Sequence, residues 1–407
     1  MKIAILTSSF PRYDGDYQGN FIYYSARGQV ELGNTVHVIC PHHPGAPFYE
    51  IMDGIEVHRF PYFYPYRLQK FSGHTGMYSA LRHSLLAVLQ LPVFIFCQFC
   101  CTGIILHRYR IEIIHSHWIV PSGLVGAVVA FLWGKPLIIT SHVLDANLFE
   151  KIRFAKPLLS VILGSADLIT TNSRYTKKMI ESRVGLSSPC RVIPMGVNLH
   201  CTHPEKKGSG GNNILFVGRL IEWKGIDTLI RSMIPVRKAI PGSRLTIVGE
   251  GSCRDSLERL VQDLRLADVV RFCGKVSDED LKKIYESADV FVLPSRSYQG
   301  LVMEGLGVVL LEAMSYGIPV IGSDIGGIPD IIDNGKNGYL FPGNDEDSLA
   351  GRIINILSDS DLQERFRYEG YVTVQSRFSW DHISHQFAEC YALVLNQFSR
   401  EHAGERW

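Results

Sequence analysis

The sequence predicts an α/β protein built from two doubly wound domains, each with its own parallel sheet. Short runs rich in β-branched and aliphatic residues recur along the 407 residues, and each is followed by a turn marked by Gly or Pro and then by a helical pattern. This alternation is typical of parallel strands joined by crossover helices. Two series of such runs are more than one open sheet usually holds, so we predict two sheets.

The predicted strands fall on either side of a polar segment. In the first half the runs are 2–10, 35–41, 111–118, 136–142, 167–173 and 191–196, and in the second half they are 213–220, 244–251, 269–276, 289–295, 319–324 and 338–341. Residues 199–213 (LHCTHPEKKGSGGNN) read as an interdomain linker. We therefore predict domains at 1–198 and 214–376. Residues 377–407 carry a helical apolar pattern and are expected to pack back on the first domain.

Composition is that of a globular protein with no global charge. Apolar residues make up 46% and charged residues 20% of the chain, and 41 Lys and Arg balance 40 Asp and Glu. Nothing in this balance indicates a nucleic-acid partner. The opening MKIAILTSSF reads as a first buried strand rather than a signal peptide. We therefore expect a cytoplasmic protein.

The nine cysteines predict a reducing environment and no metal site. They are scattered among apolar neighbours, as buried thiols are. Cys97, Cys100 and Cys101 cluster, but no second pair of Cys or His lies at zinc spacing. We therefore predict neither a metal nor a resident cofactor.

Residues 57–111 have an unusual composition, with many aromatics and no acidic residue. Their basic residues are Arg59, Arg67, Lys70, Arg82, Arg108 and Arg110. Within them, residues 85–106 form an apolar stretch nearly long enough to span a bilayer, interrupted by Gln90, Pro92 and Gln98. Core helices, attachment to an anionic membrane surface, and a span are the three interpretations. Attachment would place the protein peripherally on the inner face of a membrane.

The first candidate site follows a predicted strand in FVGRLIEWKG. Gly218 makes the turn, and Arg219 and Lys224 project beyond the carboxyl end of the strand. Arg forks onto phosphate oxygens and Lys supplies a point charge, so the pair suits a diphosphate. Two ordinary surface cations are the alternative.

The second candidate is EGLGVVLLE, residues 304–312, with a glutamate at each end of an uncharged run. Gly305 and Gly307 allow the backbone to approach a ligand closely. A helix that begins near Gly307 would offer its free amides to phosphate. Glu312 would then accept ribose hydroxyls and Glu304 would meet a sugar, whereas the alternative is a buried helix with two surface carboxylates.

A glycine-containing loop follows the first strand. Gly19 lies just before a helix expected near Asn20, where a loop amide could meet a phosphate. Asp14 and Asp16 in the same loop are more typical of turn residues than of metal ligands.

Histidines follow two further strands. His115 and His117 stand in IIHSHW, and His142 stands in TSHVLDAN together with Asp145. A histidine at the carboxyl end of a central strand can contact a ligand hydroxyl or phosphate, although satisfied core histidines are as common.

Taken together, these segments resemble the retaining glycosyltransferases of family 4, which have the two-domain GT-B fold. The resemblance covers nearly the whole chain and includes FVGRLIEWKG, IVGEG, the segments around 271–295 and 304–341, and in the first half HSHWIVPSG, TSH, TNSRYT and VIPMGVN. One departure is that Gly15 and Gly19 are separated where many members have adjacent glycines.

The resemblance implies a role for each matching position. It assigns Arg219 and Lys224 to the diphosphate, Glu312 to the ribose, and Glu304 and His142 to the donor sugar. It assigns the amides of Gly19, Gly307, Val308 and Val309 to the phosphates and the backbone of Lys275 and Val276 to the nucleobase. The resemblance carries over no role for Asp16, His117 and Asp145, which we predict on the acceptor side, in the N-terminal domain. Glu304, His142, Arg219 and Lys224 are the expected catalytic set, without a metal.

The implied activity is transfer of a hexose from a UDP- or GDP-linked donor to an acceptor hydroxyl, with retention at the anomeric carbon. The acceptor would be a sugar, a small molecule, or a lipid-linked or polysaccharide glycan of cell-envelope biosynthesis. Two alternatives from other classes remain: a catalytically silent nucleotide-sugar-binding protein, and a sugar phosphorylase of the same architecture.

Overall fold

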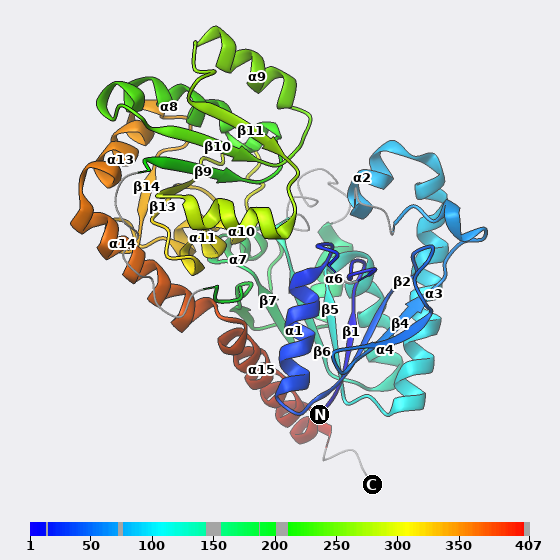
Figure 1. Ribbon diagram of the computed structural model, residues 1–407. Coiled ribbons are helices and arrows are strands. Elements are labelled where there is room, and N and C mark those ends of the chain that lie inside the picture. The colour runs from blue at the N-terminus through cyan, green and yellow to red at the C-terminus, as the bar shows by residue number, and fades with distance from the viewer. Residues whose placement is uncertain (14, 72–75, 144–155, 187, 201–210, 403–407) are drawn as a thin grey trace. The chain divides into compact units, whose positions relative to one another are not determined.

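The computed structural model in Figure 1 describes every residue except 14, 72–75, 144–155, 187, 201–210 and 403–407. The chain divides into two compact units. Unit 1 comprises Met1–Asn172, Thr176–Gly196 and Trp380–Trp407, and unit 2 comprises Ser173–Tyr175 and Val197–Ser379. Most of the predicted linker, 201–210, lies outside the described residues.

Unit 1 is built on an eight-stranded sheet with the order β3-β4-β2-β1-β5-β6-β7-β8. All neighbouring strands are parallel except β3 and β4, which are antiparallel. The strands are β1 (Lys2–Leu6), β2 (Thr35–Pro41), β3 (Tyr49–Met52), β4 (Ile55–Phe60), β5 (Ile113–His117), β6 (Leu137–Ser141), β7 (Leu168–Thr171) and β8 (Cys190–Val192). The six strands predicted for the first half are present in the predicted sequence order.

Sequence reasoning missed the hairpin β3–β4. Its two-residue turn is Asp53-Gly54, and both residues have positive φ, 46° and 82°. Asp-Gly between two short β-rich runs is a strong hairpin signal, because such turns need left-handed backbone at both positions. The Asp53-Gly54 dipeptide could therefore have predicted this hairpin from the sequence.

Two sets of helices cover the sheet of unit 1. The helices are α1 (Asn20–Glu31), η1 (Tyr66–Leu68), α2 (Gly76–His83), α3 (Leu85–Tyr109), η2 (Ile119–Gly123), α4 (Leu124–Trp133), α6 (Lys156–Gly164), α7 (Arg174–Arg183) and α15 (Trp380–His402). Helices α1 and α15 share one buried cluster with strands β1, β2 and β4. The C-terminal helix α15 therefore belongs to the core of unit 1, and Figure 1 shows it beside α1.

Helix α3 is one continuous helix of 25 residues that contains Pro92, not a pair of core helices. Buried Gln98 anchors it, since its Nε2 donates to Ser122 Oγ at 3.1 Å. A Cβ added at Gly103 would lie 2.9 Å from the Trp133 ring, which shows how closely α3 packs on α4. By length and composition α3 could cross a membrane. Within unit 1, 28% of its most apolar 18-residue window is buried.

Unit 2 is built on a fully parallel six-stranded sheet with the order β11-β10-β9-β12-β13-β14. The strands are β9 (Asn213–Val217), β10 (Arg244–Val248), β11 (Val270–Gly274), β12 (Val290–Leu293), β13 (Val320–Ser323) and β14 (Tyr339–Phe341). The helices are η3 (Glu222–Lys224), α8 (Ile226–Ala239), α9 (Arg254–Asp263), α10 (Asp278–Ser287), α11 (Val308–Ser315), α12 (Ile328–Ile331), α13 (Glu346–Ser358), α14 (Ser360–Thr373) and η4 (Val374–Phe378). The prediction of two doubly wound sheets is confirmed.

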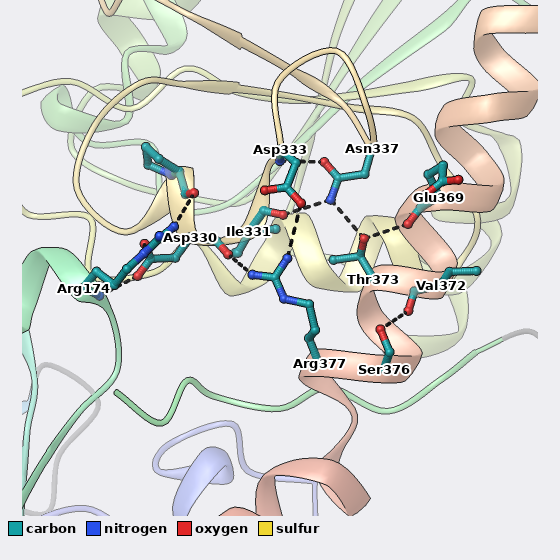
Figure 2. A network of polar contacts seen from close by, with 11 residues as sticks. Arg174, Asp330, Ile331, Asp333, Asn337, Glu369, Val372, Thr373, Ser376 and Arg377 are labelled. Carbon is teal, nitrogen blue, oxygen red and sulfur yellow. Dashed lines mark hydrogen bonds and ion pairs between the residues drawn. The ribbon is translucent and has the colours of Figure 1, made fainter. Parts of the chain in front are cut away.

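A polar network ties the end of α14 and η4 to the loop after α12 (Figure 2). Asn337 Nδ2 donates to the carbonyl of Ile331 and to Thr373 Oγ1, both at 3.0 Å. Arg377 donates to the carbonyl of Asp330 at 2.9 Å, and Arg174 pairs with the Asp330 carboxylate at 2.7 Å. These contacts fix the last helices of unit 2 before α15 begins.

Candidate functional site

The strand order of unit 2 defines where a ligand should bind. The parallel strands β9 and β12 are neighbours at the centre of the sheet, and the strand order reverses there: β10 and β11 are added on one side, and β13 and β14 on the other. In doubly wound sheets, ligands occupy the crevice at the carboxyl ends of the strands on either side of this point. A ligand of unit 2 should therefore lie beside the residues that follow Val217 and Leu293, where β9 and β12 end.

The loop after β9 is held against the end of β12 by a glycine. Gly225 has φ of 65°, and a Cβ there would lie 2.0 Å from the carbonyl oxygen of Pro294. A larger side chain is thus excluded by both backbone conformation and space. This close approach carries Lys224, at the end of η3, towards the residues that follow β12.

Lys224 and Glu304 form an ion pair at this point. Lys224 Nζ lies 2.6 Å from Glu304 Oε2, and Ser295 Oγ donates to the same oxygen at 2.7 Å. The side chains of Lys224 and Glu304 are 14% and 12% exposed. Oε1 of Glu304 accepts no hydrogen bond from the side chains or backbone of the described chain. Two predicted site residues are therefore in direct contact, and Ser295, which the prediction did not include, supports them.

Arg219 lies in the same loop and is exposed. Its guanidinium stands 5.8 Å from the centre of the Trp223 ring. Within the described part of the chain it has no carboxylate partner. Lys275 and Val276 lie beyond the carboxyl end of β11, in the loop before α10.

The predicted helix start at Gly307 is present. Helix α11 begins at Val308, and Gly307 precedes it with φ of 92°. The segment before it is tightly packed, because a Cβ on Gly326 would lie 2.1 Å from the carbonyl oxygen of Glu304. The amides of Val308 and Val309 are at the free end of the helix, where anions are stabilised.

Glu312, in the second turn of α11, accepts a hydrogen bond from a tyrosine that the sequence did not predict as a site residue. Tyr285 O–H donates to Glu312 Oε2 at 3.0 Å, and the Tyr285 ring stacks on Tyr316 with centroids 4.9 Å apart. Burial raises the pKa of Glu312, and the Tyr285 hydrogen bond opposes that rise. Tyr285 lies in the segment KKIYESADVFVLPS, but nothing local marked its hydroxyl as a partner of a carboxylate 27 residues away.

In unit 1, Gly19 is the residue before α1 and has φ of 77°. A Cβ on it would lie 2.6 Å from the carbonyl oxygen of Ser9, so this position also requires glycine. Asp16 in the same loop forms a buried bidentate pair with Arg12, at 2.6 and 2.9 Å. Burial opposes ionisation, yet the Arg12 hydrogen bond and charge lower the pKa of Asp16 overall. The Asp16 carboxylate therefore holds the loop.

The histidines at the strand ends of unit 1 differ in their partners. His115 bonds Tyr391 of α15 at 2.7 Å and Thr140 at 2.6 Å, so it is a satisfied core residue. His117 ends β5 and is 2% exposed, and neither ring nitrogen has a partner among the described residues. His142 follows β6 and is also buried, and burial lowers its pKa to about 4.

His117 and His142 stack with ring centroids 5.9 Å apart and line one small cavity with Phe21, Asn172 and Trp380. Strand β5 adjoins β1 at the point where the strand order of unit 1 reverses. His117 and His142 thus occupy the ligand-binding end of this sheet. Asp145 lies outside the described residues.

Two doubly wound units, each with glycine-rich loops and polar side chains at its strand reversal, define the GT-B class of fold. The model of the glycosyl transferases group 1 matches residues 202–373, and that of glycosyltransferase family 4 matches residues 18–200. The chain belongs to glycosyltransferase family 4.

Curated relatives match over part of their length. A GDP-mannose-dependent alpha-(1-6)-phosphatidylinositol monomannoside mannosyltransferase of Mycobacterium tuberculosis is 30% identical over 246 residues, which cover 58% of this chain and 64% of the relative. A D-inositol 3-phosphate glycosyltransferase of Acidothermus cellulolyticus is 30% identical over 298 residues, covering 66% of this chain and 64% of the relative. The chain thus spans less than two thirds of these relatives.

Solved structures match over nearly the whole chain. Sucrose-phosphate synthase of Thermosynechococcus elongatus superposes with a TM-score of 0.77 at 23% identity, covering 97% of this chain and 99% of that one. HepE of Anabaena, solved in complex with UDP, gives a TM-score of 0.69 at 19% identity and covers 96% and 100%. At these identities the likeness shows the fold.

Proposed function

We propose that the protein transfers a hexose from a nucleoside-diphosphate donor to an acceptor hydroxyl, with retention at the anomeric carbon. The observation that carries this proposal is the Lys224–Glu304 ion pair beside Ser295, at the carboxyl ends of β9 and β12. In this pair, Lys224 is a cation suited to binding phosphate, and Glu304 is a carboxylate suited to accepting sugar hydroxyls. Relatives named for GDP-mannose and structures bound to UDP support a nucleotide donor.

The cations would act on the leaving group. Negative charge grows on the diphosphate as the glycosidic bond breaks, so Lys224, Arg219 and the amides of Val308 and Val309 would stabilise the transition state more than the ground state. Arg219 has no carboxylate partner among the described residues and is therefore available to fork onto phosphate oxygens. These groups supply the charge that a metal provides in other transferases.

Glu304 would bind the sugar rather than attack it. Its Oε2 already accepts two short hydrogen bonds, one of them from a cation, which stabilises the carboxylate and weakens it as a nucleophile. Oε1 is left to accept a sugar hydroxyl. Retention would then follow from attack of the acceptor on the face that the diphosphate leaves, with a phosphate oxygen taking the proton.

Glu312 would bind the ribose of the donor. Tyr285 holds Oε2 and orients the carboxylate, so that the remaining lone pairs can accept ribose hydroxyls. The loop at Lys275 and Val276 would contact the nucleobase through its backbone.

In unit 1, we assign the amide of Gly19 to the diphosphate and His142 to the donor sugar. His117 belongs to the acceptor side, because its two buried ring nitrogens lack partners among the described residues. Asp16 acts through the loop that it holds with Arg12. Asp145 keeps its assignment to the acceptor side as a proposal.

We further propose that unit 1 docks on an anionic membrane surface through α3 and α4. Leu85, Leu89 and Phe96 of α3 are 77%, 66% and 65% exposed, and Phe131 of α4 is 86% exposed. Exposed Arg82 and Arg108 flank α3, in a stretch without acidic residues. Such a face gains from burial in the headgroup boundary and from attraction to anionic lipid, by about 1 kcal/mol per arginine. The acceptor would then be lipid-linked.

The transferase proposal is tested with a panel of UDP- and GDP-linked hexoses. Thermal shift identifies the donor, and release of nucleoside diphosphate with simple and lipid-linked acceptors measures turnover. We expect turnover with one donor and an α-linked product when the donor is α-linked. Tight donor binding with neither transfer nor hydrolysis would instead identify a silent binding protein, and phosphate-dependent release of sugar phosphate with bound pyridoxal phosphate would identify a phosphorylase.

Membrane docking is tested by sedimentation with anionic and neutral vesicles at low salt. The wild type should sediment with anionic vesicles, and the double variant Leu89→Asp/Phe96→Asp should stay in the supernatant. Tyr368→Asp is the matched control, since Tyr368 is 59% exposed on unit 2. Equal sedimentation of all three proteins, or none with the wild type, would refute docking through this face.

A further inference from the structure

Strands β2 and β4 carry three polar side chains on the face of the sheet that packs against α3. His37 is the register partner of Glu56, and His58 lies two residues beyond Glu56 on the same face. Val36, Val38 and Cys40 of β2 and Val57 of β4 point to the opposite face, into the cluster shared with α1 and α15. The end of α3 covers the polar trio, because the Tyr109 ring lies 4.4 Å from His37 and 5.5 Å from His58.

The three side chains direct one atom each at a common point. His37 Nδ1 lies 3.2 Å from His58 Nε2 and 3.4 Å from Glu56 Oε2, and His58 Nε2 lies 4.0 Å from Glu56 Oε2. His37 is 1% exposed and His58 is 11% exposed, whereas Glu56 is 23% exposed and can move. Strand pairing fixes the two histidines, and the more exposed carboxylate completes the set.

These spacings match the ligand set of a four-coordinate divalent metal. Bonds of about 2.0–2.1 Å to nitrogen and oxygen place tetrahedral ligand atoms about 3.3–3.4 Å apart. Two of the three spacings agree with this value, and a small rotation of Glu56 shortens the third. Two histidines and one carboxylate leave a fourth position for water.

The surroundings suit a bound cation. The two imidazoles lie largely buried beneath the Tyr109 ring, and a neutral imidazole has one ring nitrogen whose lone pair can bind a metal. Tyr49 O–H donates to Glu56 Oε2 at 3.4 Å and orients the carboxylate from outside the trio.

We propose that His37, Glu56 and His58 form a binding site for a divalent transition metal of the zinc class. The site lies within β2 and β4, before their carboxyl ends, so its role is to clamp two strands and the end of α3. The proposal is independent of the donor site in unit 2.

The test uses full-length protein without a polyhistidine tag. Zn²⁺ should bind the wild type with one tight site by calorimetry, and at about a hundredfold excess over its Kd should raise Tm by about 5 °C or more. Glu56→Gln and His58→Gln should each lose this site, while remaining folded by circular dichroism. His107→Gln, which changes an exposed histidine at the end of α3, should keep it.

Cobalt distinguishes this site from the cysteines. Co²⁺ at the proposed site should give a visible d–d band of four-coordinate character without the near-ultraviolet charge-transfer band of a thiolate. An absence of saturable Zn²⁺ binding would mean that the two histidines share a hydrogen bond instead, and would overturn the proposal. Binding that persists in Glu56→Gln and His58→Gln, or that shows the thiolate band, would also overturn it.

Discussion

The two sheets place contrasting side chains at the points where their strand order reverses. In unit 2 the cluster is ionic: Lys224, Ser295 and Glu304 share short hydrogen bonds, and Arg219 stands nearby without a carboxylate partner in the described chain. In unit 1 the cluster is neutral and aromatic: His117 and His142 stack beside Phe21 and Trp118. The same backbone plan thus presents a charged surface in one unit and an uncharged one in the other.

The proposed function accounts for this difference by what each cluster would contact. Fixed cations bind a phosphate group and stabilise the charge that develops on it. Buried neutral imidazoles accept or donate single hydrogen bonds to hydroxyls without the cost of burying a charge. Under the proposed function, the cations of unit 2 stabilise the charge on the diphosphate, and the histidines of unit 1 add neutral contacts to sugar hydroxyls beside those of Glu304.

The largest expected effect is a loss of stability in acid that originates in unit 1. Burial lowers the pKa of His37, His58 and His142 to about 4 and that of His115 to about 3, and it also lowers the pKa of His117 well below its usual value. In the unfolded chain a histidine takes up a proton near pH 6.5, whereas in the fold it stays neutral until the pH approaches its lowered pKa. Between these two pH values the unfolded state binds more protons, so the free energy of unfolding falls as the pH falls.

Each such histidine should lower the free energy of unfolding by about 1.4 kcal/mol for each pH unit below 6.5. Several together should therefore lower it by several kcal/mol at pH 5.5. Chemical denaturation from pH 7.5 to 5 measures this. His117→Gln should reduce the pH slope by about one proton, and the exposed control His107→Gln should not. A flat profile in the wild type would show that these imidazoles are not buried in neutral form.

The next effect concerns the charged cluster of unit 2. Lys224→Ala should lower kcat by roughly 10² or more, because it removes charge stabilisation of the leaving diphosphate. Lys282→Ala is the matched control, since Lys282 is 59% exposed on α10 and pairs with Glu286 at 3.9 Å. Steady-state release of nucleoside diphosphate provides the measurement. Near wild-type turnover in Lys224→Ala would remove the distinction between the two clusters.

A smaller effect separates the two glutamates of the α11 segment. Glu312→Ala should weaken donor binding about tenfold, and Tyr285→Phe by a few-fold, because a hydrogen bond to a charged group contributes about 1.5–3 kcal/mol and its orienting partner less. Tyr368→Phe on α14 is the control, being exposed. Calorimetric titration of the donor gives the affinities. Unchanged affinity in Glu312→Ala would refute its assignment to the ribose.

Sequence alone predicted the parts of this molecule that depend on local pattern. The β-branched runs predicted twelve of the fourteen strands in the described residues, and the glycine at 307 predicted the start of α11. Family resemblance placed Lys224 and Glu304 in one donor site, but their direct contact, across 80 residues of sequence, was not predicted.

The rest depends on contacts between distant segments. Ser295 and Tyr285 acquire their partners only when β12 and α10 pack beside α11. His115 could not be told from His117 in sequence, because the difference is the hydroxyl of Tyr391, 276 residues later. The trio of His37, Glu56 and His58 required the register of β2 and β4, and β4 was not predicted.

The central claim is that the charged cluster of unit 2 binds the diphosphate of a nucleotide donor. Titration of nucleosides and nucleoside diphosphates into the wild type and into Lys224→Ala tests it most directly. In the wild type, the diphosphate of the preferred base should bind at least tenfold more tightly than the nucleoside. In Lys224→Ala this advantage should largely disappear, while the affinity for the nucleoside stays unchanged. An equal diphosphate advantage in both proteins would contradict the account.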